Sequence, residues 1–449
     1  MWTYLLKKDI DVYLDRYPSL ADEFEQLWLY ETKDACFLPR LMYNNFPSDK
    51  LIQYHGKKII EPQKVKFNFN GQLRPDQVPI MQTYFNILKH QGHVNGIIKA
   101  RPGIGKTVMT VYIAAKLGLK TCVIIDNTSL LEQWIKEIYD FTDLTVDDIG
   151  IVKQKLTVTN KPITVAMCQS LLSKVKGNLK NAFDFIDESR FGFVTYDEVH
   201  NTSSSEMFAK VSLLFRTLNI LGLSATPFQT GIAEILMKNT IGEIIYETNQ
   251  YELKPKYYMV YYKSGLDQLD NGKHFKKIAS INDYLMRRAI YNKITVQSNE
   301  YFRLITTYTK NLKNNGHRVI IICFTKKQVE MISDKLTAFG VENRRYYGGE
   351  KDTLDKENDE VIVVTYSFAG KGFNMKKLSA LIYATPLAGK KSIIQTAGRI
   401  LRDYAGKREP VIVDLIDMCF PFMFLKDIKK KTKIVNDEFD IPVLEHREM

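Results

Sequence analysis

Two series of short, apolar, β-branched runs are the feature that most limits how this chain can fold. Each run holds four to seven residues, and segments long enough for a helix separate them. This alternation is typical of buried parallel strands connected by helices, so we expect two α/β domains. The first series is 96–99, 121–126, 163–167, 193–196 and 220–223, and the second is 318–324, 344–347, 361–365, 380–383 and 411–415.

The remaining segments divide the chain around these series. We expect a small amino-terminal module at 1–70, for which DNA binding is the function considered, and α/β domains at 71–252 and 253–425. The second domain should include a helical insert near 281–313, and a charged tail, expected as a helix followed by a mobile end, should follow at 426–449. On the apolar face of the insert we expect Tyr284, Leu285, Ile290, Ile294 and Leu304.

The net charge and the lengths of the apolar runs indicate which classes of protein the chain can belong to. Lys and Arg number 63 against 51 Asp and Glu, a formal net charge of +12, and such a surface attracts phosphate backbones or anionic membranes. No apolar run reaches the roughly 18 residues of a membrane span, and no signal-peptide pattern opens the chain. We therefore expect a cytoplasmic protein, in the host cytoplasm if it is viral. The five cysteines lie far apart, which argues against structural zinc.

A phosphate-binding loop is expected at 100–107 (Ala-Arg-Pro-Gly-Ile-Gly-Lys-Thr), which follows the first strand and opens a helix. Gly103 and Gly105 lack a Cβ, so the backbone can point its N–H groups at phosphate oxygens. Lys106 would neutralise the β- and γ-phosphates, and the Thr107 hydroxyl would bind Mg²⁺. A tight glycine-rich turn is the competing interpretation.

Two acidic residues end another apolar strand of the first series. Asp197 can hold Mg²⁺ through water, and Glu198 can orient and deprotonate the attacking water. His200 could couple the nucleotide to neighbouring loops, although a surface or helix-capping histidine is the alternative. Ser224 and Thr226 follow the next strand in a polar turn before proline, and they could report the state of the phosphate.

Two arginines mark the second half of the chain. Arg399 and Arg402 are expected on one face of a helix, where guanidinium groups could stabilise a transferring phosphoryl group. Taken alone, the pair is better explained by a surface ion-pair face. The glycine-rich segment 367–374 follows a strand and suits a phosphate contact, or a simple βα loop.

In this order and spacing, the motifs resemble those of superfamily-2 helicases, and the resemblance covers about residues 73–416. It implies two tandem RecA-like domains that bind ATP and Mg²⁺ between them. The matching segments are 73–77 (adenine motif), 100–107 (motif I), 127–134 (motif Ia), 197–200 (a DExH motif II), 224–226 (motif III), 367–374 (motif V) and 395–402 (QxxGRxxR, motif VI).

The resemblance also implies further contacts. Gln77 would read adenine with support from Arg74, and Gly370 and Gln395 would help to hold the nucleotide. Contacts with the nucleic-acid phosphates would come from Thr128, Gln169, Ser170, Thr325 and Ser367.

Within the superfamily, His200 and the opening of motif VI differ from DEAD-box RNA helicases. The pattern is similar to the group of XPB-like, restriction-translocase and phage UvsW-like proteins. This implies an ATP-driven helicase or translocase on duplex or branched DNA, in fork remodelling, branch migration, repair or recombination. Asn127 and Asp76 depart from the family pattern. An RNA helicase or transcript-release ATPase and a non-catalytic nucleic-acid-binding scaffold are the alternatives.

Overall fold

The computed structural model separates the chain into two compact units, which are described one at a time. One unit comprises residues 1–100 and 104–248, and the other comprises 101–103 and 249–449. The structure describes residues 2–21, 24–27, 30–45, 49–54, 61–177, 179–199, 211, 214–215, 217–227, 232–248, 251, 253–347, 358–369, 375, 377–387, 389–402 and 406–448.

The first unit is built around a sheet with eight described strands in the order β12-β5-β11-β10-β6-β9-β7-β8. All neighbouring strands run parallel except β8, which pairs antiparallel with β7. The strands are β5 (Asn95–Ala100), β6 (Thr121–Ile125), β7 (Ile149–Lys153), β8 (Leu156–Thr157), β9 (Ile163–Met167), β10 (Phe193–Asp197), β11 (Asn219–Ser224) and β12 (Ile244–Thr248).

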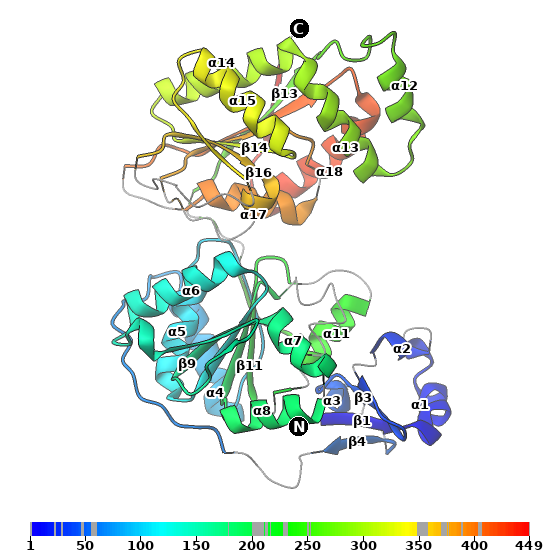
Figure 1. Cartoon of the computed structure of the whole chain (residues 1–449), viewed down its shortest axis with the longest axis vertical. Helices are drawn as coiled ribbons and strands as arrows, with labels where there is room; N and C mark the ends of the chain where they lie inside the picture. Colours follow the sequence, from blue (N-terminus) through cyan, green and yellow to red (C-terminus); the bar gives the residue numbers. More distant parts are fainter. Residues whose placement is uncertain are drawn as a thin grey trace. The chain divides into compact units, whose positions relative to one another are not determined.

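Helices cover both faces of this sheet because its strands are apolar on both sides. Ile98 and Val123 join one buried cluster, whereas Ile97 and Cys122 join the cluster on the opposite face. On the first face lie α4 (Val78–Gln91), α5 (Lys106–Leu117) and α6 (Thr128–Phe141), and on the second lie α7 (Cys168–Gly177), α8 (Leu179–Ser189) and α11 (Ile232–Thr240) (Figure 1). A short 3₁₀ helix, η3 (Val146–Asp148), precedes β7.

The amino-terminal module is an antiparallel sheet in the order β2-β3-β1-β4 with short helices. Its elements are β1 (Trp2–Leu6), η1 (Lys7–Asp9), α1 (Ile10–Arg16), η2 (Pro18–Leu20), α2 (Phe24–Leu27), β2 (Tyr30–Glu31), β3 (Ala35–Leu38), α3 (Met42–Asn45) and β4 (Leu51–Tyr54).

This module shares a core with the rest of the first unit. Leu236 of α11 packs in the same buried cluster as Leu5 and Tyr13. The Arg40 guanidinium, which is 2% exposed, donates from Nη1 to the Thr217 carbonyl at 2.8 Å. The sequence predicts a module separate from the α/β domain, whereas in the structure the module packs against that domain.

The second unit contains a sheet with seven described strands in the order β15-β16-β14-β17-β18-β13-β19, all parallel. The strands are β13 (Lys256–Tyr262), β14 (Val319–Cys323), β15 (Arg344–Tyr346), β16 (Val361–Thr365), β17 (Ala380–Tyr383), β18 (Val411–Asp417) and β19 (Val443–Arg447).

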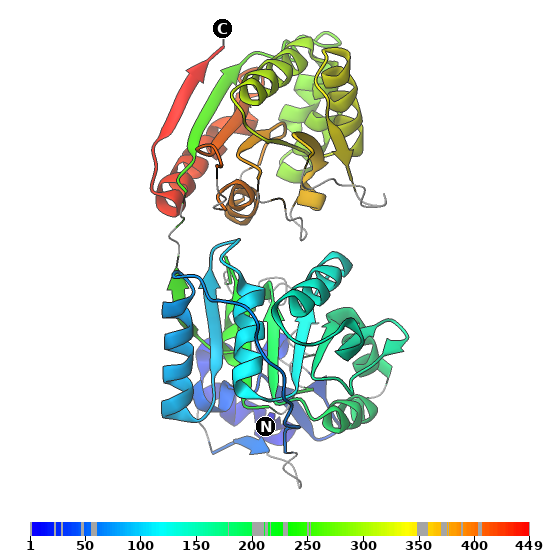
Figure 2. The same ribbon diagram turned by 90° about the vertical axis from the view of Figure 1, so that its left-hand side faces the viewer.

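The carboxyl-terminal segment contains the expected helix, and its end forms a strand where a mobile tail is expected. The helix α18 (Pro421–Phe439) packs Val435 and Phe439 into the core, and β19 pairs with β13 at the edge of the sheet (Figure 2). Polar side chains are compatible with an edge strand because backbone hydrogen bonds, not apolar burial, hold it to its neighbour.

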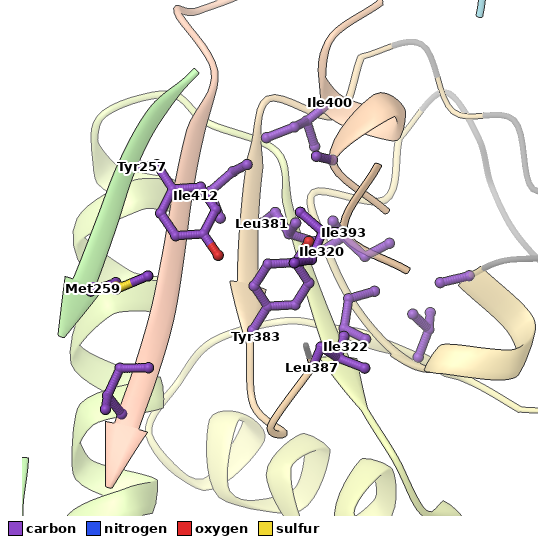
Figure 3. Packing of buried hydrophobic residues seen from close by; sticks show 14 of the residues in the cluster. Tyr257, Met259, Ile320, Ile322, Leu381, Tyr383, Leu387, Ile393, Ile400 and Ile412 are labelled. Carbon is purple, nitrogen blue, oxygen red and sulfur yellow. The ribbon is translucent and has the colours of Figure 1, made fainter. Parts of the chain in front are cut away.

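The second sheet is also covered on both faces. On one face, Tyr257, Tyr383 and Ile412 pack in one cluster with Ile393 and Ile400 of α17 (Lys390–Ile400) (Figure 3). Residues of α12 (Lys273–Ser280), α13 (Tyr284–Ile294), α16 (Tyr366–Ala369) and α18 belong to the same cluster. On the other face lie α14 (Asn299–Asn314) and α15 (Lys326–Ala338), and the 3₁₀ helix η4 (Thr295–Gln297) leads into α14.

The expected helical insert forms α13 and α14, but its predicted apolar face is partly wrong. Ile294 and Leu304 are buried, whereas Leu285 is 61% exposed. Leu285 lies in the first turn of α13, on the side of the helix that faces solvent.

A buried ion pair joins α18 to the second sheet. Lys431 Nζ lies 2.7 Å from Asp414 Oδ2, and the two side chains are 2% and 0% exposed. The Tyr257 hydroxyl donates a second hydrogen bond to the same oxygen at 3.0 Å. Burial raises the pKa of Asp414, and the Lys431 ammonium opposes this effect.

Among the described residues, no helix is long and apolar enough to cross a membrane.

Candidate nucleotide and nucleic-acid sites

Three neighbouring strands of the first sheet carry polar residues to the same edge. In the parallel register, Ser224 at the end of β11 aligns with Lys99 of β5, and Asp197 at the end of β10 aligns with Leu223. Ligands of open α/β sheets bind outside the carboxyl ends of strands. The topology therefore brings the loop after β5 and the acidic pair after β10 to one edge.

The loop after β5 curls tightly before α5. Gly103 and Gly105 have φ values of 87° and 83°, in the left-handed region that favours glycine. A Cβ on Gly105 would lie 2.4 Å from Nε2 of Gln77, so no larger residue fits without movement. Thr107, in the first turn of α5, is buried. The first N–H groups of a helix form a ready anion site, and here they follow the loop directly.

Gln77 holds the loop from the side of α4. Its side chain is 2% exposed; Nε2 donates to the Ile104 carbonyl at 2.7 Å, and Oε1 accepts from the Arg74 backbone N–H at 2.9 Å. The Arg74 guanidinium lies 3.3 Å from Oδ1 of Asp76. The predicted adenine-reading residues therefore also fix the shape of the phosphate loop.

Lys106 and the two acidic residues lie close together. Lys106 Nζ is 3.8 Å from Glu198 Oε1 and 3.5 Å from the Ala100 carbonyl oxygen. Asp197 is almost fully buried, and its Oδ2 accepts a 2.8 Å hydrogen bond from the Trp134 indole. Burial and the neighbouring Glu198 carboxylate raise the pKa of Asp197. The Lys106 ammonium acts in the opposite direction.

The backbone at Glu198 has an unusual conformation. Its φ is 50°, a left-handed conformation that is uncommon for residues other than glycine. Its backbone N–H donates to Asp197 Oδ1 at 2.9 Å. The turn lets consecutive carboxylates serve different atoms of a bound ligand. His200, the predicted coupling residue, lies outside the described residues.

Trp134 and Asn127 were missed as site residues by the sequence analysis. Trp134 is fully buried on α6 and reaches Asp197 across the sheet edge. Asn127 caps the same helix, with its side-chain oxygen accepting from the Leu130 N–H at 3.1 Å. An Asn before a helical pattern is a capping signal that could have been recognised. No sequence pattern predicts the hydrogen bond between Trp134 and Asp197.

The predicted coupling residues after β11 form a closed turn. The Ser224 hydroxyl is buried and accepts from the Thr226 backbone N–H at 3.0 Å. Both residues therefore lie at the same sheet edge as Asp197. Because β10 and β11 are neighbouring strands, a movement at the end of one strand would also move the end of the other.

The three predicted nucleic-acid contacts of the first unit are placed differently. Thr128, at the start of α6, is exposed, and Gln169 is exposed with Nε2 donating to the Asp126 carbonyl at 2.8 Å. Ser170 is buried, and its hydroxyl accepts from the Gln154 N–H at 2.8 Å. Ser170 thus supports a turn, and its hydroxyl does not face solvent as the prediction requires.

In the second unit, Thr325 is the N-cap of α15. Its hydroxyl accepts a hydrogen bond from the Gln328 N–H at 3.2 Å. In return, Oε1 of Gln328 accepts a hydrogen bond from the Thr325 N–H at 3.1 Å. Ser367 is exposed on α16, with its hydroxyl 3.3 Å from that of Thr365. Gly370 lies outside the described residues.

The predicted arginine pair does not share one helix. Gln395 and Arg399 are half-buried on α17, but α17 ends at Ile400, and Arg402 follows the helix cap. The expectation of a common helical face is therefore wrong for Arg402. Their action at a nucleotide pocket stays a prediction.

Comparison with protein families matches the two units separately. Residues 70–229 match the model described as "Type III restriction enzyme, res subunit", and residues 300–404 match "Helicase conserved C-terminal domain". This is the domain pair of a superfamily-2 helicase. In a superfamily-2 helicase this pair is an ATP-dependent motor, an ATP hydrolase.

The helicase has distant viral relatives. A protein of Acanthamoeba polyphaga mimivirus, named as a candidate ATP-dependent RNA helicase, is 26% identical over 78% of this chain and 65% of its own length. A probable helicase of Escherichia phage T5 is 26% identical over 71% of this chain and 67% of its own length. The helicase chain thus spans about two thirds of these relatives.

A solved structure shares the fold. The ATP-dependent Type ISP restriction–modification enzyme LlaBIII, bound to DNA, aligns with a TM-score of 0.59 at 15% identity and covers 91% of this chain and 33% of its own. The expected α/β class with two tandem RecA-like domains and a small additional sheet is confirmed.

Proposed function

We propose that this protein is an ATP-driven helicase or translocase that acts on forked, branched or duplex DNA. The observation that carries the ATPase part is the placement of Lys106, Asp197 and Glu198. Lys106 Nζ lies 3.8 Å from a Glu198 oxygen, at the edge where the glycine-rich loop meets α5. A phosphate loop and an acidic pair at one sheet edge are what phosphoryl transfer to water needs.

Each residue has a separate task in this proposal. The α5 N-terminus and Lys106 bind the β- and γ-phosphates, and Glu198 orients and deprotonates the attacking water. Thr107 and Asp197 fit Mg²⁺, which binds through few protein oxygens together with waters and nucleotide phosphates. Mg²⁺ would supply charge neutralisation of the phosphates. Arg399 and Arg402 would stabilise the transferring phosphoryl group from the second domain.

DNA is favoured as the substrate because the first unit matches a restriction-enzyme family. The net charge of +12 suits a phosphate backbone of either kind. The name of the mimivirus relative favours the second candidate, an RNA helicase.

The ATPase part is tested with Lys106→Ala. Losing the ammonium should slow DNA-stimulated phosphate release by about a hundredfold or more, the usual cost of removing one preorganised charge-stabilising donor. Lys116→Ala is the matched control, because Lys116 is exposed in the last turn of the same helix. A Lys106→Ala protein with the wild-type rate would exclude this site.

The substrate is tested by ATPase and strand-separation rates on single-stranded, duplex, forked, four-way and RNA–DNA hybrid substrates. Strongest stimulation by forked or four-way DNA supports the proposal, and preference for RNA would replace it with the RNA helicase. Binding without a single ATP turnover would favour a non-catalytic scaffold.

A further inference from the structure

The first turn of α13 carries two large apolar side chains into solvent. Leu285 is 61% exposed and Met286 is 56% exposed, although Tyr291 and Ile294 of the same helix are buried in the core. Leu285 and Met286 therefore lie on the solvent side of the first turn of α13, next to the half-buried Tyr284. Isolated exposed apolar residues need no explanation, but an adjacent pair at the tip of a hairpin is a candidate contact surface.

Hydrogen bonds stiffen the tip where α12 turns into α13. Arg287 donates from Nε to the Ile281 carbonyl and from Nη2 to the Ala279 carbonyl at 3.3 Å. Asp283 caps α13 by accepting from the Met286 N–H at 2.6 Å. The Arg287 guanidinium also lies 5.5 Å from the centre of the Phe422 ring. Leu285 and Met286 therefore follow a turn that hydrogen bonds hold in place.

Lysine and arginine are frequent in the segment that contains the pair. Residues 263–293 contain more than twice as many Lys and Arg as Asp and Glu residues. Lys273, Lys276 and Lys277 are exposed on α12, and Phe275 of the same helix packs on Phe420 and Phe422. An apolar tip beside exposed lysines complements stacked bases flanked by phosphates, because bases offer apolar faces and the backbone is anionic.

The hairpin is joined directly to a predicted nucleic-acid contact. Three residues farther along α13, the Arg288 guanidinium lies 4.3 Å from the centre of the Phe324 ring, next to Thr325. One turn later, the buried Asn292 accepts a hydrogen bond from Nε2 of Gln328 at 2.9 Å. Gln328 is the residue that forms the capping box with Thr325. α13 therefore fixes the tip relative to the loop that we expect to contact a phosphate.

We propose that the α12–α13 hairpin is a junction-contacting element of this helicase. Leu285 and Met286 pack against the last base pair at a DNA fork, and the α12 lysines hold the adjoining backbone. Apolar side chains that wedge against base steps unstack them, which assists strand separation. This inference rests on the proposed function and names the part of the chain that meets the fork.

The test is the double variant Leu285→Ala/Met286→Ala on a forked duplex with 2-aminopurine in the junction base pair. Both side chains are largely exposed, so folding should be unaffected. We expect strand separation to slow by about tenfold, equivalent to about 1.4 kcal/mol, and the fluorescence rise at the junction on binding to be lost. ATPase stimulated by single-stranded DNA should stay at the wild-type rate. Leu156→Ala is the matched control, an exposed leucine in the first unit.

A second variant tests the charged part. Lys276→Ala/Lys277→Ala should reduce the slope of log affinity for the fork against log salt by about two, one unit for each lost phosphate contact.

The outcomes separate this inference from the proposed function. Wild-type protein that shows no DNA-stimulated ATP hydrolysis defeats the proposed function, and the junction fluorescence on binding still tests the hairpin without ATP. Strand separation and junction fluorescence at wild-type levels in the double alanine variant would overturn the inference. An unchanged salt slope in the lysine variant would show that the α12 lysines do not contact the DNA backbone.

Discussion

Replacing Lys431 with Met should strongly destabilise the second unit at high pH and much less at low pH. The substitution keeps most of the side-chain volume but removes the ammonium that lies 2.7 Å from Asp414 Oδ2. Breaking a fully buried pair costs about 3–5 kcal/mol, because one charge is left without compensation. The remaining hydrogen bond from the Tyr257 hydroxyl cannot replace the lost charge.

Protonation of Asp414 sets the pH dependence of this loss. The carboxyl has an ordinary pKa of 3.8, so holding it neutral costs about 6 kcal/mol at pH 8 and about 2 kcal/mol at pH 5. A carboxyl with a raised folded pKa binds more protons when folded than when unfolded, so the stability falls as pH rises. The loss in the variant should therefore be about 3–5 kcal/mol at pH 8 and at most about 2 kcal/mol at pH 5.

Amide hydrogen exchange in peptides that contain β13 and β18 measures this loss, with variant and wild type compared at each pH. The chain has three tryptophans, all before residue 249, where the second unit's main segment begins, so tryptophan fluorescence is an internal reference that should not change. Lys433→Met, an exposed lysine on the same helix, is the control. A loss below about 1 kcal/mol at pH 8, or an equal loss at both pH values, would refute this reasoning.

Two further substitutions test contacts in the first unit. Trp134→Phe removes the 2.8 Å donor to Asp197, so the Mg²⁺ concentration for half-maximal ATP hydrolysis should change and the rate should fall by about tenfold or more; unchanged Mg²⁺ dependence would count against this role. Arg40→Met leaves the buried Thr217 carbonyl without its donor and should lower the unfolding free energy by about 1–3 kcal/mol, measured by denaturant titration of tryptophan fluorescence. An equally stable variant would show that Arg40 does not secure the module.

The sheets and the phosphate loop could be predicted because their signals are local. Apolar runs such as Val361–Thr365, separated by helix-length segments, are typical of buried parallel strands, and glycines before Lys106 between a strand and a helix indicate a phosphate loop. β19 could not be predicted in this way. Its side chains are mostly exposed, and the backbone pairing with β13 that holds it leaves no apolar pattern.

Contacts between segments that are distant along the chain could not be predicted from the sequence either. The hydrogen bond from Trp134 to Asp197 depends on where α6 lies over the sheet, which no residue near either partner reveals. The exposure of Leu285 has the same origin. A helical period predicts which residues share a face, but the length of helix that reaches the core depends on the neighbouring elements.

The amino-terminal module has a consequence for how the protein is made. Its core is completed by Leu236 of α11, and Arg40 reaches the carbonyl of Thr217, so both partners leave the ribosome long after the module itself. A nascent chain grows at about 5–20 residues per second, so the module waits on the order of ten seconds for them. During that time its apolar face is open to chaperones, and a fragment ending before α11 should be captured by them and degraded.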